Sequence, residues 1–258
     1  MLIDSHCHLD MFDDSLCDTI VKNANTAGVG YMLNACSARA SFEKIINIVN
    51  SYDCVFGAIG QHPHEAESEG IVSKDELLTF ISKSKKIIAL GETGLDYSLE
   101  NYNRDLQIEN LINHIDVSKQ SGLPLIIHNR NSDSDMIDIL SSEFKKQSFK
   151  AIIHCFTATK EMADIMLDMG FYISASGIIT FKSAESLREV FSTIPYDRLL
   201  VETDSPYLAP VPFRGKTNEP AFVVETAKKL AEITEKSFDE ISNITTENFK
   251  RLFGLDIK

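Results

Sequence analysis

Two histidines near the start of the chain, His6 and His8, have the spacing of a metal-chelating pair. They follow the short apolar run Leu2-Ile3, which is typical of a strand. Because the side chains of a strand repeat every two residues, both imidazoles are expected on one side and Cys7 on the other. Two neutral imidazole nitrogens aimed at one point are suitable ligands for a divalent cation. A lone His-x-His is common, so its meaning depends on which other ligands lie beside it.

Further candidate ligands stand at the ends of other apolar, β-rich runs. They are His62 and His64, Glu92, His128, His154 and Asp204. A single histidine or carboxylate after a strand is usually a loop residue, a helix cap or a salt-bridge partner. Several strands of one chain that all end in such residues indicate a metal centre. Of the seven histidines only His114 falls elsewhere, in the middle of an expected helix, and we interpret it as a structural or surface residue.

Eight β-rich runs recur along the chain, and their starts lie about 20 to 36 residues apart. They are Leu2-Ile3, Val29–Leu33, Cys54–Ile59, Ile87–Leu90, Leu123–Ile127, Ala151–Ile153, Phe171–Ile173 and Leu199–Val201. Amphipathic helices are predicted in several of the intervals, because apolar residues recur there at helical spacing. The clearest are 41–49, 74–82 with Ser73 as a cap, 103–120 ending at Gly122, and a methionine-rich stripe over 162–169 ending at Gly170.

This alternation predicts an α/β protein with a parallel sheet, and eight units in about 250 residues favour a single (β/α)8 TIM barrel of the metal-dependent hydrolase type over residues 1–258. The alternative is an open Rossmann-like sheet, which normally carries a glycine-rich loop after its first strand. Here Ser5–His8 follow that strand, and no glycine occurs before Gly28. In a barrel the carboxyl ends of all strands share one face, where active sites are built.

The composition excludes several other classes of protein. Hydrophobic residues make up 43% of the chain, yet no apolar run approaches the ~20 residues that span a bilayer, so no membrane association is expected. Five scattered cysteines without a CxxC pair predict neither a disulfide framework nor a thiolate zinc site, and they favour a reducing cytoplasm. The net charge of −13 disfavours long-range attraction of a polyanion, so any contact with nucleic acid should be local and centred on metal.

The types of ligand indicate the chemistry. Imidazoles and carboxylates without thiolates suit Mg²⁺, Mn²⁺, Zn²⁺ or Co²⁺. Six candidates, His6, His8, Glu92, His128, His154 and Asp204, are too many for one catalytic ion, which usually has three protein ligands. They suit two ions ~3.5–4 Å apart, which activate a water and clamp the attacking and leaving oxygens of a displacement. This is hydrolysis, most naturally at phosphorus.

At these residues the chain resembles the TatD-related metal-dependent hydrolases, often called TatD-type deoxyribonucleases, of the amidohydrolase-like barrel superfamily. The matching segments are 4–10 (DSHCHLD), 60–64 (GQHPH), 91–97 (GETGLDY), 124–128 (PLIIH), 154–157 (HCFT), 202–208 (ETDSPYL), 214–215 (RG) and 218–220 (NEP). They occur in order over most of the chain, and their combination is far more specific than any one of them.

The resemblance implies a role for each ligand. His6 and His8 would hold one ion together with Asp204, and Glu92 would bridge to a second ion held by His128 and His154. Asp204 and Glu92 would be the catalytic carboxylates, with Asp204 as general base toward water or hydroxide at the metals.

Four residues are candidates for contact with substrate. His62 would bind a phosphate or simply turn the chain, and the planar fork of Arg130 would pair with two phosphate oxygens or form a salt bridge. Arg214 and Asn218 lie on the loop after Asp204, where they would shape the substrate mouth or serve as loop scaffold.

The chain departs from the family pattern around the substrate. Asn131-Ser132 replaces the usual acid-then-alanine after the arginine that follows the strand-5 histidine. Thr157-Ala158-Thr159 replaces a glycine-containing turn, and Thr217 stands where a basic residue is common. These changes leave the metal ligands intact and bear on the choice of substrate.

Three functions follow from these residues. The first is a 3′-to-5′ exodeoxyribonuclease that acts on single-stranded DNA ends, with RNA ends as a further possibility. The second is hydrolysis of an ester or amide, such as aminoacyl-tRNA deacylation. The third is a catalytically idle barrel that serves as a binding protein. The sequence does not predict the native metal or the oligomeric state.

Overall fold

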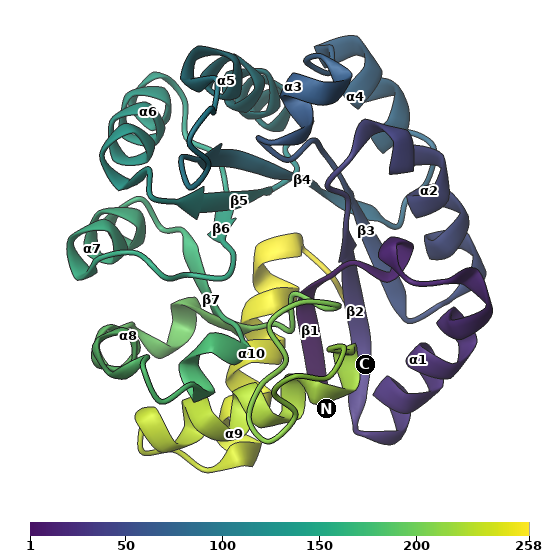
Figure 1. Cartoon of the computed structure of the whole chain (residues 1–258), viewed down its shortest axis with the longest axis vertical. Helices are drawn as coiled ribbons and strands as arrows, with labels where there is room; N and C mark the ends of the chain where they lie inside the picture. The colour runs from purple at the N-terminus through teal and green to yellow at the C-terminus, as the bar shows by residue number, and fades with distance from the viewer. Residues whose placement is uncertain (258) are drawn as a thin grey trace. The chain divides into compact units, whose positions relative to one another are not determined.

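The computed structural model describes residues 1–257 and contains one eight-stranded sheet with the strand order β1 to β8 (Figure 1). The strands are β1 Leu2–Cys7, β2 Val29–Ala35, β3 Val55–Ile59, β4 Ile87–Asp96, β5 Leu125–Arg130, β6 Ala151–Ile153, β7 Tyr172–Ala175 and β8 Leu199–Val201. All eight predicted strands are present. Their sequential order, with helices after each strand, is that of a (β/α)8 TIM barrel, which confirms the predicted fold class.

Ten α-helices occur within the described residues. They are α1 Asp14–Thr26, α2 Phe42–Ser51, α3 Glu65–Glu69, α4 Lys74–Ile81, α5 Arg104–Ser121, α6 Asp133–Lys146, α7 Lys160–Asp168, α8 Glu185–Phe191, α9 Val223–Ile233 and α10 Phe238–Phe253. Short 3-10 helices occur at η1 Leu9–Met11, η2 Arg39–Ser41, η3 Gly177–Thr180, η4 Tyr196–Arg198 and η5 Pro220–Phe222. The predicted signals act locally: the Ser73 hydroxyl accepts from the Glu76 N–H at the start of α4, and Gly122 takes φ +77° at the end of α5. None of the helices within residues 1–257 has the length and apolar character needed to cross a membrane.

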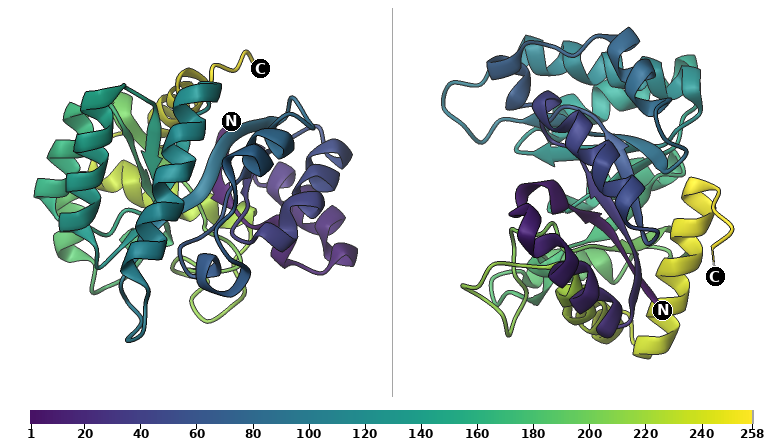
Figure 2. Two further views of the ribbon diagram at one scale, coloured as in Figure 1. Left: turned by 90° about the horizontal axis from the view of Figure 1, so that it is seen from above. Right: turned by 90° about the vertical axis from the view of Figure 1, so that its right-hand side faces the viewer.

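The chain divides into two compact units. The first contains residues 1–34, 154–156 and the described chain from residue 172 onward, and the second contains residues 35–153 and 157–171. In the first unit the Thr246 hydroxyl donates to the Met1 carbonyl at 3.0 Å, so the N-terminus lies beside α10 (Figure 2). The first and last strands are also neighbours in this unit, because Cys7 forms a parallel bridge with Ser205. The ends of β1 and β8 are therefore held side by side.

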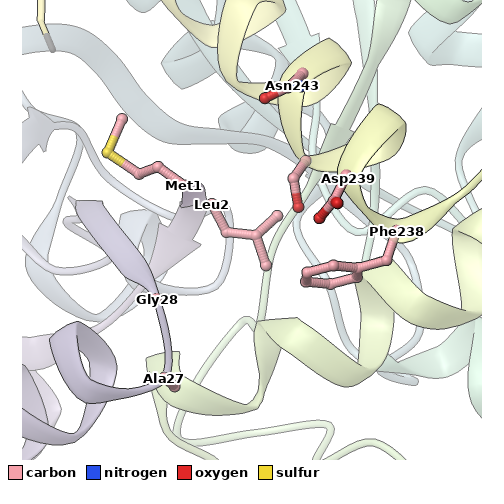
Figure 3. Close-up of a pocket in the computed structure, with 8 residues that line it drawn as sticks. Met1, Leu2, Ala27, Gly28, Phe238, Asp239 and Asn243 are labelled. Carbon is pink, nitrogen blue, oxygen red and sulfur yellow. The ribbon is translucent and has the colours of Figure 1, made fainter.

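A pocket of about 350 Å³ lies in the first unit at the beginning of β1 (Figure 3). Its lining residues are Met1, Leu2, Ala27, Gly28, Phe238, Asp239, Ser242 and Asn243. His6 and His8 stand at the other end of the same strand. The pocket is thus separate from His6 and His8, on the face of a barrel that is associated with stability and not with chemistry.

In the second unit β4 is longer than the sequence predicts. It runs from Ile87 to Asp96 instead of ending at Leu90, and every residue in it is buried. The extension pairs in register with β5, with Gly94 opposite His128 and Asp96 opposite Arg130. Glu92 and Asp96 therefore project from a strand and not from the loop that the sequence predicts after it. Side chains on a paired strand are held more firmly than side chains on a loop.

His114, in the middle of α5, is a buried structural residue. Its Nδ1–H donates to the Asn110 carbonyl at 2.8 Å, and its Nε2 accepts from the Gln61 N–H at 3.2 Å. This arrangement needs the neutral ring, and burial lowers the pKa of His114 from 6.5 to about 4. The helix thereby anchors the backbone directly before His62, and of the two interpretations of His114 the buried structural one is correct.

The buried neutral ring makes stability depend on pH. Between pH 6.5 and 4 the unfolded chain binds a proton at His114 that the folded chain excludes, so stability falls as pH falls. We expect this residue to account for a loss of about 2 kcal/mol between pH 7 and pH 5. His114→Gln keeps a hydrogen-bond acceptor but does not titrate. In urea unfolding, the free energy of unfolding of this variant should therefore fall by about 2 kcal/mol less between pH 7 and pH 5 than that of the wild type. An equal loss in the variant and the wild type would contradict this account.

Candidate metal centre

Three ligand atoms converge at the end of β1 in the first unit. The Nε2 atoms of His6 and His8 lie 3.1 Å apart, and Asp204 Oδ1 lies 3.6 Å from the first and 3.3 Å from the second. Both histidines are buried, while the Asp204 side chain is 15% exposed. The His-x-His spacing therefore brings the two imidazoles together as predicted, with the predicted carboxylate beside them.

Backbone hydrogen bonds fix these three residues. The Asp204 N–H donates to the His6 carbonyl at 2.9 Å, and the His8 N–H donates to the Ser205 carbonyl at 2.8 Å. One residue earlier, the Thr203 N–H donates to Asp4 Oδ1 at 2.9 Å. Asp204 itself has φ +57°, a left-handed conformation that aspartate tolerates better than most residues. The ligand positions are thus set by the end of β1, which contains His6, and by the segments that directly follow β1 and β8.

The environment keeps Asp204 ionised. Burial alone would raise the pKa of this carboxyl group, but the hydrogen bond with His8 and the charges of His6, His8 and His154 bring the pKa below its usual range. At neutral pH Asp204 is therefore a carboxylate. It can bind a cation or accept a proton without first having to lose one.

His154 lies in the same unit and stacks on His6. Their ring centroids are 3.9 Å apart and their planes are inclined by 8°. His154 Nδ1 is 3.4 Å from Glu202 Oε1, which also accepts from the Cys155 N–H at 2.7 Å. A carboxylate at one imidazole nitrogen orients the ring and makes the other nitrogen the ligand atom. Glu202 therefore lies where it can orient this ring, and it belongs to the sequence motif although our site prediction did not include it.

In the second unit His128 lies between two carboxylates. Its Nδ1 is 3.0 Å from Glu92 Oε1, and its Nε2 is 3.0 Å from Asp96 Oδ2. Burial of Asp96 would raise its pKa, but the hydrogen bonds with His128 and Ser98 lower it well below its usual range. Asp96 is therefore ionised, and its carboxylate lies where it can orient the His128 ring from the Nε2 side while Nδ1 faces Glu92. Sequence reasoning missed Asp96, because the predicted loop gave it no fixed direction.

His62 and His64 join this cluster from the end of β3. His62 Nε2 lies 3.8 Å from Glu92 Oε1, and His64 Nε2 lies 3.4 Å from Asp96 Oδ2. Burial, reinforced by His128, lowers the pKa of His62 to about 3, so its ring is neutral at physiological pH. Ligand atoms of His62, Asp96 and His128 are close enough together to hold an ion. The His-Pro-His turn thus places both rings beside carboxylates. The contact between His64 and Asp96 was not predicted from the sequence.

The predicted substrate arginines differ in their surroundings. Arg130 ends β5 with an exposed side chain, and its carbonyl accepts from the Tyr97 N–H at 2.9 Å. Arg214 is also exposed, and its guanidinium carbon lies 3.9 Å from the centroid of the Phe181 ring. The exposed fork of Arg130 is thus attached to the strand beside Asp96, whereas Arg214 rests on an aromatic ring in its own unit.

Asn218 is wholly buried in the loop after Asp204. Its amide donates to the Thr203 carbonyl at 2.9 Å and to the Tyr207 carbonyl at 2.5 Å. These bonds tie the loop to the segment that carries Asp204. The side chain therefore acts as loop scaffold, which is one of the two roles that its position predicts.

The chain is similar to known proteins over nearly its whole length. A sequence model described as TatD related DNase matches residues 3–254. The metal-dependent hydrolase YabD of Bacillus subtilis is 40% identical over 99% of this chain and 100% of its own length. The metal-dependent hydrolase YcfH of Escherichia coli K12 is also 40% identical, over 99% of this chain and 96% of its own.

Solved structures show the same fold. The TatD homologue YjjV of Escherichia coli K12 has a TM-score of 0.92 at 26% identity and covers 99% of this chain and 98% of its own. A TatD-family hydrolase of Entamoeba histolytica has a TM-score of 0.84 at 26% identity and covers 98% of this chain and 97% of its own. The barrel fold therefore extends over essentially the whole chain.

Proposed function

Because this chain belongs to the family of TatD-related DNases and is a metal-dependent hydrolase, we propose that it cleaves phosphodiester bonds of DNA and releases nucleotides from the 3′ ends of single strands. The observation that carries the proposal is the convergence of His6, His8 and Asp204 at the end of β1. Imidazole and carboxylate ligands of this kind suit a hydrolytic divalent ion.

The spacing of the ligand atoms fits an ion. Two ligands bound to one ion at ~2.1 Å lie ~3–3.5 Å apart in common coordination geometries. His6, His8 and Asp204 give separations of 3.1, 3.3 and 3.6 Å, and Glu92 and His128 give 3.0 Å. These groups are buried or largely buried, their separations are close to those that one bound ion would require, and they contain no thiolate.

We assign one ion to His6, His8 and Asp204. The second ion has Glu92 and His128 as proposed ligands in the second unit. Its completion by His154, and the bridging of both ions by Glu92, stay predictions from the sequence. When bound, two such ions would make water a stronger acid and would stabilise charge on the attacking and leaving oxygens.

The side chains of the protein perform the remaining tasks. Asp204, ionised at neutral pH, accepts the proton of the attacking water. Arg130 offers an exposed planar fork that pairs with two phosphate oxygens. Asp96 holds His128 in one tautomer, so that the ligand nitrogen faces Glu92.

Loss of the Asp96 carboxylate should weaken metal binding without removing a ligand of either assigned ion. We expect Asp96→Asn to lower the affinity for Mn²⁺ by about 10- to 100-fold, because the ring of His128 loses its charged partner. Titration calorimetry measures this change. Asp135→Asn, which removes a carboxylate bound to Tyr97 and Arg104, is the matched control and should bind Mn²⁺ like the wild type. Unchanged affinity in Asp96→Asn would contradict the assigned role.

End-labelled oligonucleotides test the proposed reaction. With Mg²⁺ or Mn²⁺ the enzyme should release mononucleotides from the 3′ end of single-stranded DNA, and chelation should stop the release. A panel of aryl esters and aminoacyl esters is tested in parallel. Hydrolysis of acyl substrates without release of nucleotides would replace the nuclease proposal by the ester or amide alternative, and no hydrolysis of any substrate would favour a binding protein.

A further inference from the structure

Tyr207 displays an aromatic ring beside the proposed metal ligands. The residue is 54% exposed, and its ring centroid lies 6.4 Å from that of His8, with the planes inclined by 71°. Tyrosine combines an apolar face with a polar tip, which suits it to contacts with a ligand at a surface. An exposed ring next to a reaction centre is a candidate contact for substrate.

The ring stands on a rigid support. The Tyr207 N–H donates to the Asp204 carbonyl at 2.9 Å, and its own carbonyl accepts from the buried Asn218 amide at 2.5 Å. Within residues 1–257 no hydrogen bond holds its hydroxyl group. The backbone thus fixes the base of the side chain, and within residues 1–257 no hydrogen bond of the hydroxyl group would have to break for a ligand to stack on the ring.

The negative charge of the protein increases the importance of an uncharged contact with nucleic acid. With a net charge of −13, the chain gains little from the counterion release that drives most binding to nucleic acid. Stacking of a base on an aromatic face is sequence-tolerant and does not depend on net charge. Stacking would bind the end of a DNA strand to an acidic enzyme without relying on attraction between basic side chains and phosphates.

We propose that Tyr207 is the platform on which a nucleobase of the DNA end stacks while its phosphodiester lies at the ligands His8 and Asp204. This inference rests on the proposed function and specifies how the same site binds its substrate. The platform is tolerant of base identity, because every base has a π-face. Asn218 acts indirectly, as a positioning residue that holds the Tyr207 backbone.

Fluorescence of 2-aminopurine, which is quenched on stacking, tests the platform. The probe is a short oligothymidylate with 2-aminopurine at its 3′ end and phosphorothioate terminal linkages that resist cleavage, mixed with Mg²⁺-loaded protein. The chain contains no tryptophan that would compete for the stacking signal. The wild type and Tyr207→Phe should quench the probe. Tyr207→Leu should lose the quenching and bind about tenfold more weakly.

Tyr196→Leu is the matched control. Tyr196 is 45% exposed in the same unit but lies before β8 and not after it, so this variant should behave like the wild type. Equal quenching by Tyr207→Leu and the wild type, or no quenching by the wild type, would overturn the inference. Nucleotide release from an unmodified oligonucleotide is measured separately, so a failure of the proposed nuclease reaction is distinguishable from a failure of the platform.

Discussion

Asp204→Asn should lower kcat on single-stranded DNA by at least about 10³-fold while the protein still folds. A general base alone contributes about 10²- to 10⁴-fold, and this carboxylate is also a proposed ligand beside His6 and His8. The amide keeps the shape of the side chain but neither accepts a proton nor carries negative charge. Steady-state nucleotide release, bound metal and the thermal midpoint are measured together.

Asp197→Asn provides the control for this substitution. Asp197 is 61% exposed and pairs with Arg198 in η4, before β8 and not after it. This variant should match the wild type in all three measurements. Turnover of Asp204→Asn within tenfold of the wild type would remove Asp204 from both of its proposed roles.

Gly94→Ala should produce the largest loss of stability among single substitutions near the site. A β-carbon at Gly94 would lie 1.9 Å from the His128 carbonyl oxygen, and the residue has φ +150°, which side chains rarely adopt. The obstacle is backbone of the neighbouring strand β5 and cannot rotate away. We expect a loss of about 3–5 kcal/mol in the free energy of unfolding, together with displacement of His128.

Gly122→Ala separates steric overlap from backbone conformation. Gly122 also has a positive φ, +77°, but nothing lies within 4 Å of its missing β-carbon. Its substitution should cost only about 1–2 kcal/mol. Chemical denaturation of both variants measures the difference, and similar losses would show that the contact between Gly94 and His128 does not matter.

Much of the architecture follows from local sequence signals. The eight strands are short apolar runs with clear boundaries, and Ser73 and Gly122 mark the ends of helices in the way their chemistry requires. The (β/α)8 order places the carboxyl ends of the strands on one face, so the candidate ligands were expected together there. The grouping of His6, His8 and Asp204 around one ion came from the resemblance to the TatD-related hydrolases.

The positioning residues could not be read from the sequence. The carboxylates of Asp96 and Glu202 lie beside His128 and His154, and nothing in their spacing along the sequence shows which imidazole nitrogen each one faces. The length of β4 depends on pairing with β5 across residues that are mostly polar or glycine, and this pairing is a tertiary effect. Burial of Asn218 likewise depends on the path of a long loop that local patterns do not determine.

Metal add-back to chelated protein tests the central claim most directly. Protein treated with EDTA is titrated with Mn²⁺ while bound metal and 3′-nucleotide release are recorded in the same sample. We predict no release from the metal-free protein, and release that rises as two ions bind per chain in the wild type. Full nucleotide release by metal-free protein would contradict the account.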